Sequence, residues 1–337
     1  MSLPETKMLR AAKDAMERRL NRTGKKPLRP GFELLIFLLV FFIATTLQSV
    51  ILSPFMVALL FSSDVFSPFL QGTSVNYNDM MTTVTNVLNN LPDWMMILQL
   101  FVTAVTIVAC ILYCRLFEKR GALSLGFVKK GAAFEYLAGL GLGLLLFGGA
   151  IAMGMATGRL RLSLNPSPAW GLIILYFFGY LVQGLSEEVL CRSYLMVTMS
   201  RRWPLPVAIF VNSLVFMLLH MGNPGLTLLA MVNLMLFGTF ASLYTLRRGS
   251  IWGIAAIHSI WNFAQGNIFG ISVSGLPGSP SVLQATLSEK GSLIHGGSFG
   301  MEGGIAVTIV LTLGCIALIL CKTKKSEVVE SIPLHQS

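Results

Sequence analysis

Charged residues are scarce in this chain. Only 12% of its 337 residues are Asp, Glu, Lys or Arg, whereas a soluble domain normally carries about 25%. Hydrophobic residues make up 54% of the chain and gather in repeated runs with charges confined to their ends. A soluble core could not accommodate so many runs that approach the roughly 20 residues needed to cross a bilayer. The composition therefore predicts a polytopic membrane protein.

Paired cysteines are missing as well. The five cysteines lie within or at the ends of apolar runs, and no CxxC pair occurs among them. This distribution argues against disulfide bonds and against a cysteine zinc site. The charged N-terminus argues against a cleavable signal peptide, so the first apolar run is expected to remain as an anchor.

Acidic residues are fewer than basic ones. The chain has 15 Asp and Glu against 25 Lys and Arg, which gives a formal net charge of +10. In a soluble protein such an excess would suggest nucleic acid. Here the basic residues lie at the edges of apolar segments, as the positive-inside rule predicts. The lipid bilayer is therefore an expected partner, and nucleic acid is not.

The composition divides the chain into three parts. Residues 1–30 are basic, residues 31–322 are expected to form the membrane domain, and residues 323–337 are expected to form a cytoplasmic tail. Within the first part, four apolar residues recur every four positions opposite a basic face: Met8, Ala12, Met16 and Leu20. This pattern predicts either an amphipathic helix on an anionic leaflet or a disordered basic tail.

The apolar runs predict an all-α fold with about eight transmembrane helices. The expected spans are 33–56, 93–116, 135–156, 168–199, 204–222, 226–246, 251–270 and 302–321. Basic connections alternate with connections that carry almost no Lys or Arg, which places both termini in the cytoplasm. The loop holding Arg159 and Arg161 is the exception. The short polar loops favour a bacterial plasma membrane.

The third expected span is rich in glycine. Gly139 and Gly143 are four residues apart, so they lie on one face of the helix 135–156. Small residues at this spacing allow close approach of a neighbouring helix in lipid. A phosphate-binding loop is not expected, because no strand precedes these glycines.

A few polar residues stand inside the apolar spans, where a charged side chain costs about 2.5 to 3.5 kcal/mol. They fall on three of the expected helices: Glu187, Glu188, Arg192, His220, His258 and Asn262. Such residues persist when they face a protein interior or a water-filled cavity, so this group indicates a polar site within the membrane. Glu302, at the outer edge of the last span, is expected to lie away from it.

Helical spacing separates these residues by role. Glu188 and Arg192 are four residues apart, so they share a helix face and can form an ion pair. Glu187 lies about 100° around the same helix, so its carboxylate can point elsewhere. His258 and Asn262 present an imidazole beside an amide. These groups can activate water and stabilise an oxyanion, although a membrane histidine or asparagine can also simply bond a neighbouring helix.

Three short motifs follow one another along these helices: "EEVLCR" fits Glu-Glu-x-x-x-Arg, "FMLLH" fits Phe-x-x-x-His, and "HSIWN" fits His-x-x-x-Asn. In this order they resemble the CPBP family of glutamate intramembrane proteases, which includes type II CAAX prenyl proteases and bacterial bacteriocin-processing and immunity proteins. The resemblance covers about residues 115–270. Glu188 and Arg192 match the family's supporting ion pair. Cys191 and Ser193, on either side of the arginine, depart from the family's usual aromatic residue and glycine.

The resemblance implies an intramembrane endopeptidase that hydrolyses a membrane-associated, prenylated or bacteriocin-type peptide without a cofactor. It implies that Glu187 and His220 orient and deprotonate the attacking water, and that His258 and Asn262 hold the oxyanion. Glu187 and His220 can meet if the helix that carries His220 stops near Asn223-Pro224-Gly225, still inside the membrane.

Three alternatives stay open. A zinc mechanism would use Glu187, His220 and His258 as ligands, although the chain has no HExxH motif. A non-catalytic immunity or scaffold protein would keep the fold without the reaction. A proton-coupled transporter would use the same acids as a relay, but no internal repeat supports that interpretation.

Overall fold

The computed structural model describes residues 6–24, 30–63, 65, 72, 76–277 and 279–320. The helices and strand of the first half are α1 (Lys7–Thr23), α2 (Pro30–Ser62), α4 (Tyr77–Asn89), α5 (Asp93–Val102), α6 (Ala104–Leu116), η1 (Ala122–Leu125), α7 (Ala132–Ala156) and β1 (Leu160–Leu164). The elements of the second half are α8 (Trp170–Glu188), η2 (Val189–Met196), α9 (Val197–Ser200), α10 (Leu205–Leu218), α11 (Leu228–Arg248), α12 (Trp252–Phe263), η3 (Ala264–Ile268), β2 (Leu283–Leu287), η4 (Glu289–Gly291), α13 (Ser292–His295), η5 (Gly297–Phe299), η6 (Met301–Gly303) and α14 (Ile305–Leu320). The fold is thus mostly helical, as predicted.

Among the described residues, five helical segments are long and apolar enough to cross a membrane: Gly31–Ser62, Asp93–Leu116, Ala132–Ala156, Trp170–Ser200 and Leu228–Arg248. They correspond to five of the predicted spans. The other three predicted spans, 204–222, 251–270 and 302–321, are not confirmed at full length, because α10, α12 and α14 have only 14, 12 and 16 residues. A helix of 14 residues is about 21 Å long, which is shorter than the hydrocarbon core of about 30 Å.

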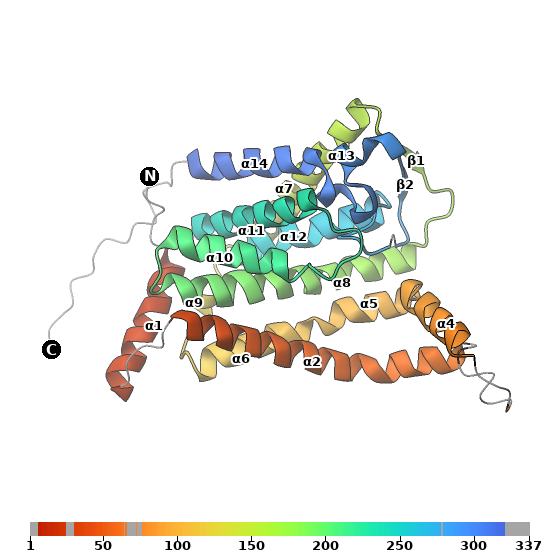
Figure 1. Ribbon diagram of the computed structural model, residues 1–337. Helices are drawn as coiled ribbons and strands as arrows, with labels where there is room; N and C mark the ends of the chain where they lie inside the picture. The colour runs from red at the N-terminus through yellow and green to blue at the C-terminus, as the bar shows by residue number, and fades with distance from the viewer. Residues whose placement is uncertain are drawn as a thin grey trace.

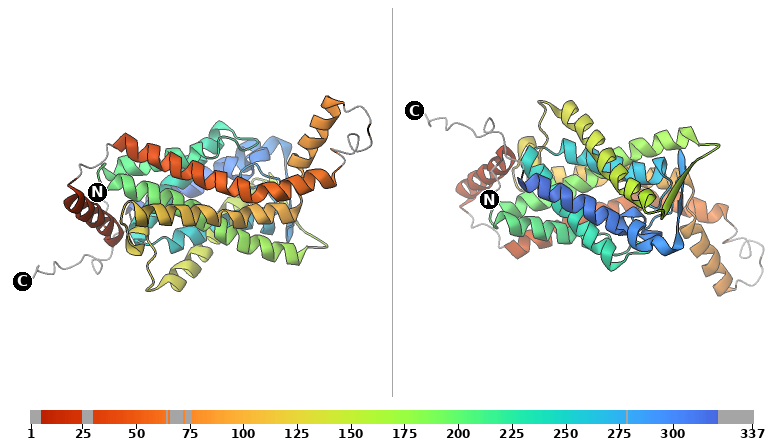
Figure 2. Two further views of the ribbon diagram at one scale, coloured as in Figure 1. Left: turned by 90° about the horizontal axis from the view of Figure 1, so that it is seen from below. Right: turned by 90° about the horizontal axis from the view of Figure 1, so that it is seen from above.

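The long helices run side by side, and the chain carries different elements at the two ends of the bundle. Helices α1 and α9 lie at one end, whereas the sheet of β1 and β2, with α13 and α4, lies at the other (Figure 1). Helix α1 crosses its end of the bundle in the further views (Figure 2). The basic connections 117–131 and 247–250 adjoin the α1 end, and Arg159 and Arg161 adjoin the sheet end.

The N-terminal segment forms a helix, as one of the two interpretations predicted. The Thr6 side chain caps α1 by accepting a hydrogen bond from the Leu9 backbone N–H at 3.3 Å. Met8 and Ala12 are fully buried, and α1 packs against η1 and α9. Two of the four apolar residues that were expected to face lipid therefore pack against the protein itself.

Glycine allows α12 to pack closely between two other helices. A Cβ atom added to Gly139 of α7 would lie 2.3 Å from a carbonyl oxygen of α12, and one added to Gly143 would lie 2.8 Å from another. On the other side, a Cβ atom at Gly184 of α8 would lie 2.8 Å from the Ser259 backbone nitrogen of α12. The predicted role of the glycine-rich helix in close packing is confirmed. Helix α12, which carries His258 and Asn262, is therefore held rigidly between α7 and α8.

The segment that follows η3 folds back over the end of the shortened helices. We call residues 271–277 and 279–304 the cap. Its strand β2 pairs antiparallel with β1, from Leu160 opposite Leu287 to Leu164 opposite Leu283. This small sheet departs from the predicted all-α fold. The cap also reaches the turn after α10, where the Asn223 side chain donates a hydrogen bond to the Ser274 carbonyl at 2.9 Å. The cap is thus tied both to β1 and to the turn in which α10 stops.

A buried ion-pair network ties the loop after α6 to the helix that continues α8. Glu118 accepts from Arg120 at 3.0 Å and from Arg201 at 2.6 Å. Burial alone would raise the pKa of Glu118, but the two guanidinium groups outweigh burial and hold this pKa below its usual value. Arg120 also donates to the Ser193 carbonyl, and the Ser193 hydroxyl donates to the Leu125 carbonyl at 2.6 Å. The residue that departs from the family's glycine therefore helps to anchor η2.

Candidate active site

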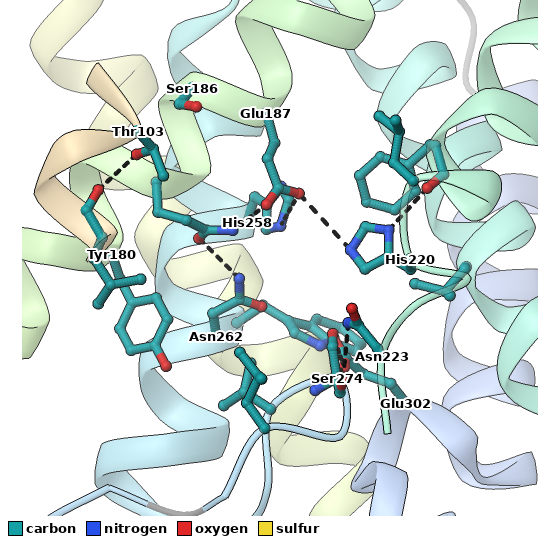
Figure 3. Close-up of a pocket in the computed structure, with 18 of the residues that line it drawn as sticks. Thr103, Tyr180, Ser186, Glu187, His220, Asn223, His258, Asn262, Ser274 and Glu302 are labelled. Carbon is teal, nitrogen blue, oxygen red and sulfur yellow. Dashed lines mark hydrogen bonds and ion pairs between the residues drawn. The ribbon is translucent and has the colours of Figure 1, made fainter. Parts of the chain in front are cut away.

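A cavity of about 330 Å³ opens between the helices that carry the three motifs. Four of the six predicted site residues line it: Glu187, His220, His258 and Asn262. Figure 3 shows Glu187 pointing toward both histidines, with Asn262 below it and Asn223, Ser274 and Glu302 beyond His220. The structure therefore brings residues from α8, α10, α12 and the cap to one place.

The remaining two predicted residues form the expected ion pair behind the cavity. Arg192 Nη1 lies 3.0 Å from Glu188 Oε1, and both side chains are fully buried. The guanidinium carbon of Arg192 also lies 4.6 Å from the centre of the Phe216 ring, a cation–π distance. The pair sits at the junction of α8 with the π-helical η2, a kind of helix distortion that is frequent at functional sites.

Glu188 has a second partner, which sets the orientation of His258. Its Oε1 lies 2.8 Å from His258 Nδ1. A carboxylate can only accept, so Nδ1 carries a proton, and Nε2 is directed toward Glu187 Oε2 at 3.7 Å. For Nε2 to donate to an oxyanion, both ring nitrogens must carry protons, and two carboxylates beside the ring stabilise that positive charge.

His220 presents the same ring nitrogen, Nε2, to Glu187, but its Nδ1 contacts a backbone carbonyl instead of a carboxylate. Helix α10 ends at Leu218, earlier than the predicted stop near Asn223-Pro224-Gly225, so His220 lies in the turn beyond the helix instead of on it. Its Nδ1 lies 2.8 Å from the Phe216 carbonyl oxygen, which can only accept, so Nδ1 carries the proton. In the neutral ring, Nε2 is then the acceptor nitrogen, and it faces Glu187 Oε2 at 4.0 Å. That nitrogen is available to accept a proton or a hydrogen bond from water.

The two carboxylate oxygens of Glu187 differ in their hydrogen bonds. Its Oε1 accepts from the Gln183 side-chain amide. Its Oε2 is a buried atom without a hydrogen-bond partner in the described part of the chain. A water molecule that bridges two acceptors at hydrogen-bond length can span the 4.0 Å between this oxygen and His220 Nε2. The arrangement suits a carboxylate that holds water against a histidine.

Gln183 contacts two of the predicted site residues, although the three motifs do not include it. It lines the cavity, and its Oε1 accepts from Asn262 Nδ2 at 3.0 Å. The sequence held a signal for it, because Gln183 lies four residues before Glu187 and so shares its helix face. The first motif begins at Glu187 and therefore does not include Gln183.

Glu302 was expected to lie away from the motifs, and this prediction is wrong. The carboxylate lines the same cavity as Glu187. Its Oε2 accepts from the Ser274 backbone N–H at 2.8 Å and from the Ser274 hydroxyl at 2.6 Å. Asn233 of α11 donates to the Glu302 carbonyl at 2.7 Å. The reason for the error is the cap, which turns the chain back into the bundle before α14 begins.

The described residues contain no group of three or more His, Cys, Asp or Glu side chains placed to hold a metal ion. The zinc alternative names Glu187, His220 and His258 as ligands. Glu187 Oε2 lies 3.7 Å from His258 Nε2 and 4.0 Å from His220 Nε2. Their donor atoms are imidazole nitrogens and a carboxylate oxygen, which are ordinary zinc ligands. Chemistry alone therefore leaves this set compatible with zinc.

Fold and site together define a class: a helical membrane protein whose core encloses a polar cavity with a carboxylate between two histidines. Residues 169–264 match the family model described as Type II CAAX prenyl endopeptidase Rce1-like. This match contains all three motifs and confirms the resemblance to the CPBP family. Residues 169–264 are therefore similar to that family of membrane endopeptidases. Searches of curated proteins and of solved structures give no match. The cap lies outside the matched segment.

Proposed function

We propose that the protein is an intramembrane endopeptidase that hydrolyses a peptide bond with water activated by Glu187 and His220. One observation carries this proposal: Glu187 Oε2 lies 4.0 Å from His220 Nε2 and 3.7 Å from His258 Nε2 at the wall of a cavity. A carboxylate placed between two imidazoles within a membrane helix is costly. It is useful where protons must be moved.

The reaction follows from the directions of the groups. Water held between Glu187 Oε2 and His220 Nε2 loses a proton to this pair while its oxygen attacks the scissile carbonyl carbon. The negative charge that develops on the carbonyl oxygen is stabilised by donors from His258 Nε2 and Asn262 Nδ2. The proton then passes to the leaving amine as the C–N bond breaks, which returns the site to its starting state.

The substrate that fits this cavity is a membrane-associated peptide. The lining combines apolar side chains with amides and hydroxyls, drawn from α2, α5, α8 and α11 as well as the motifs. An extended peptide with apolar side chains, whether prenylated or of the bacteriocin type, would find both apolar contacts and hydrogen-bond partners there. Cys191 lines the cavity where the family usually has an aromatic residue, so this position leaves more room for substrate.

One observation favours the zinc alternative enough to test it. The contact between Glu188 and His258 Nδ1, at 2.8 Å, is the kind of carboxylate–histidine contact that orients metal-binding histidines. With zinc bound, Glu187, His220 and His258 would be its ligands, and the metal would polarise water.

We expect the purified protein to cleave a prenylated, tripeptide-tailed reporter, or a substrate found by comparing membrane peptides with and without the gene. Activity should persist after exhaustive removal of zinc with a chelator, because Glu187 and His220 can position water by themselves. Product formation before and after chelation is the measurement. If chelation removes activity and stoichiometric zinc restores it, the zinc mechanism replaces ours. If no membrane peptide differs and no reporter is cleaved, the scaffold interpretation replaces both.

We also propose that the α1 end of the bundle is cytoplasmic, in a bacterial plasma membrane, because the basic connections gather there. In a background without native cysteines, a cysteine introduced at Asn21 of α1 should react with a membrane-impermeant thiol reagent only after the membrane is opened. A cysteine at Lys290 in the cap should react in intact cells. One at Gln336, outside the described residues, should behave like Asn21. Labelling of Asn21 and Lys290 from the same side would contradict this orientation.

A further inference from the structure

The Gln183 side chain touches both halves of the proposed site. On α8 it lies one helical turn before Glu187, and its Nε2 donates to Glu187 Oε1. Its Oε1 accepts from Asn262 Nδ2 of α12 at 3.0 Å. One amide therefore connects the carboxylate that activates water with the amide that faces the oxyanion.

The donor and acceptor roles of Glu187, Gln183 and Asn262 follow from one another. An ionised carboxylate can only accept hydrogen bonds, so Glu187 obliges Gln183 to present its Nε2. The Gln183 oxygen must then face Asn262, and that oxygen can only accept. Asn262 is in turn obliged to present its Nδ2, which carries two hydrogens. One hydrogen goes to Gln183, and the second remains for the cavity.

We propose that Gln183 is a positioning residue that couples the ionised state of Glu187 to the donor orientation of Asn262. This inference rests on the proposed function, because it assigns Gln183 a part in that reaction. If Asn262 turned its amide over, it would present an oxygen to the developing oxyanion and oppose the reaction. Gln183 prevents that rotation as long as Glu187 is ionised and ready to accept a proton.

A purely structural role, in which Gln183 joins α8 to α12, is already filled by other contacts. Gly184 packs directly on Ser259, where a Cβ atom would lie 2.8 Å from the backbone nitrogen. The glycines of α7 hold α12 from the other side at comparably short distances. Loss of two hydrogen bonds at Gln183 therefore leaves the helices packed and changes the orientation of Glu187 and Asn262.

The test needs a readout that packing does not affect, and the pH–rate profile provides one. The titratable and charged groups around Glu187 belong to α8, η2, α12, the turn after α10 and the cap: Tyr176, Tyr180, Glu188, Cys191, Arg192, His220, His258 and Glu302. None of them is altered by a substitution at Gln183. A shift in the profile of a Gln183 variant therefore reports the lost amide.

Gln183→Met keeps the length of the side chain and removes both hydrogen bonds. We expect kcat for a verified substrate to fall about 10- to 100-fold with KM nearly unchanged, because a catalytic group is misplaced by a fraction of an ångström. The acidic side of the profile should move to higher pH, since the ionised carboxylate loses a donor. Gln284→Met is the matched control, because Gln284 is exposed on β2 and lies outside the cavity. Gln183→Ala replaces the methionine variant if detergent melting shows that the latter is unfolded.

A double variant tests whether Gln183 acts through Asn262. Gln183→Met should add much less to the loss in kcat when Asn262 is already alanine, because no amide remains to be oriented. Full multiplication of the two losses would overturn the inference, as would a wild-type kcat and pH profile in Gln183→Met. Both results leave the proposed function intact as long as Glu187→Gln is inactive. A fully active Glu187→Gln would instead refute the proposed function itself.

Discussion

Protein carrying Glu187→Gln is expected to bind substrate and to cleave it about 10²- to 10⁴-fold more slowly than wild type. The substitution keeps the shape of the side chain and removes its ability to take a proton, and general bases typically contribute 10²- to 10⁴-fold. The Glu187 side chain is 28% exposed and its Oε2 lacks a hydrogen-bond partner in the described part of the chain. An amide there should not unfold the protein. Single-turnover cleavage and detergent melting measure the two effects separately.

The matched control for this change is Glu289→Gln. Glu289 is an exposed glutamate of the cap and does not line the cavity, so the variant should cleave at the wild-type rate. Glu302 is unsuitable, because it lines the cavity and holds Ser274 in place. Cleavage by Glu187→Gln at the rate of Glu289→Gln would remove water activation from Glu187 and reopen the scaffold and transporter interpretations.

The helices and the main contacts of the site follow from local rules that a sequence displays. Apolar runs locate the five long spans, and the spacing of four predicts the pair of Glu188 with Arg192, which forms at 3.0 Å. The Asn-Pro-Gly sequence predicts that the helix carrying His220 stops early, and α10 does so, although it ends at Leu218, five residues before Asn223. Each of these features depends on residues that are close in the chain.

Contacts between distant segments could not be predicted in the same way. The hydrogen bond between Gln183 and Asn262 joins positions 79 residues apart, and Asn233 reaches Glu302 across 69 residues. The sequence of the cap is a mixture of Gly, Ser and Pro that resembles an ordinary loop. Its fold depends on close backbone approaches, such as Gly275 against the Pro224 carbonyl oxygen, where a Cβ atom would lie 1.9 Å away. No periodic pattern marks such contacts.

The surface against which α1 packs could not be predicted from the sequence either. Periodicity identifies a helix with one apolar face but does not identify the surface that the face covers. Met8 and Ala12 are buried against the protein, where a lipid leaflet would have satisfied the same pattern. Composition distinguishes apolar from polar surroundings, and it does not distinguish lipid from protein.

Arg192→Ala is expected to destabilise the protein more than any other single change considered for the site. Arg192 and Glu188 are both fully buried, so the substitution leaves the Glu188 carboxylate without its guanidinium partner and with only the His258 contact, at a cost of up to roughly 3 to 5 kcal/mol. It also removes the cation over the Phe216 ring at 4.6 Å. The Phe216 carbonyl holds His220, so activity should fall together with the folded yield. Detergent melting and reporter cleavage are the measurements.

Two further variants separate the lost charge from lost packing. Arg161→Ala, on the exposed face of β1, is the matched control and should melt like wild type. Adding Glu188→Gln to Arg192→Ala should recover part of the lost stability, because no unpaired carboxylate then remains in the low-dielectric interior. The recovered protein should still cleave poorly, since Glu188 also holds His258 at 2.8 Å. Wild-type melting of Arg192→Ala alone would show that water reaches the pair and that the ion pair does not support the site.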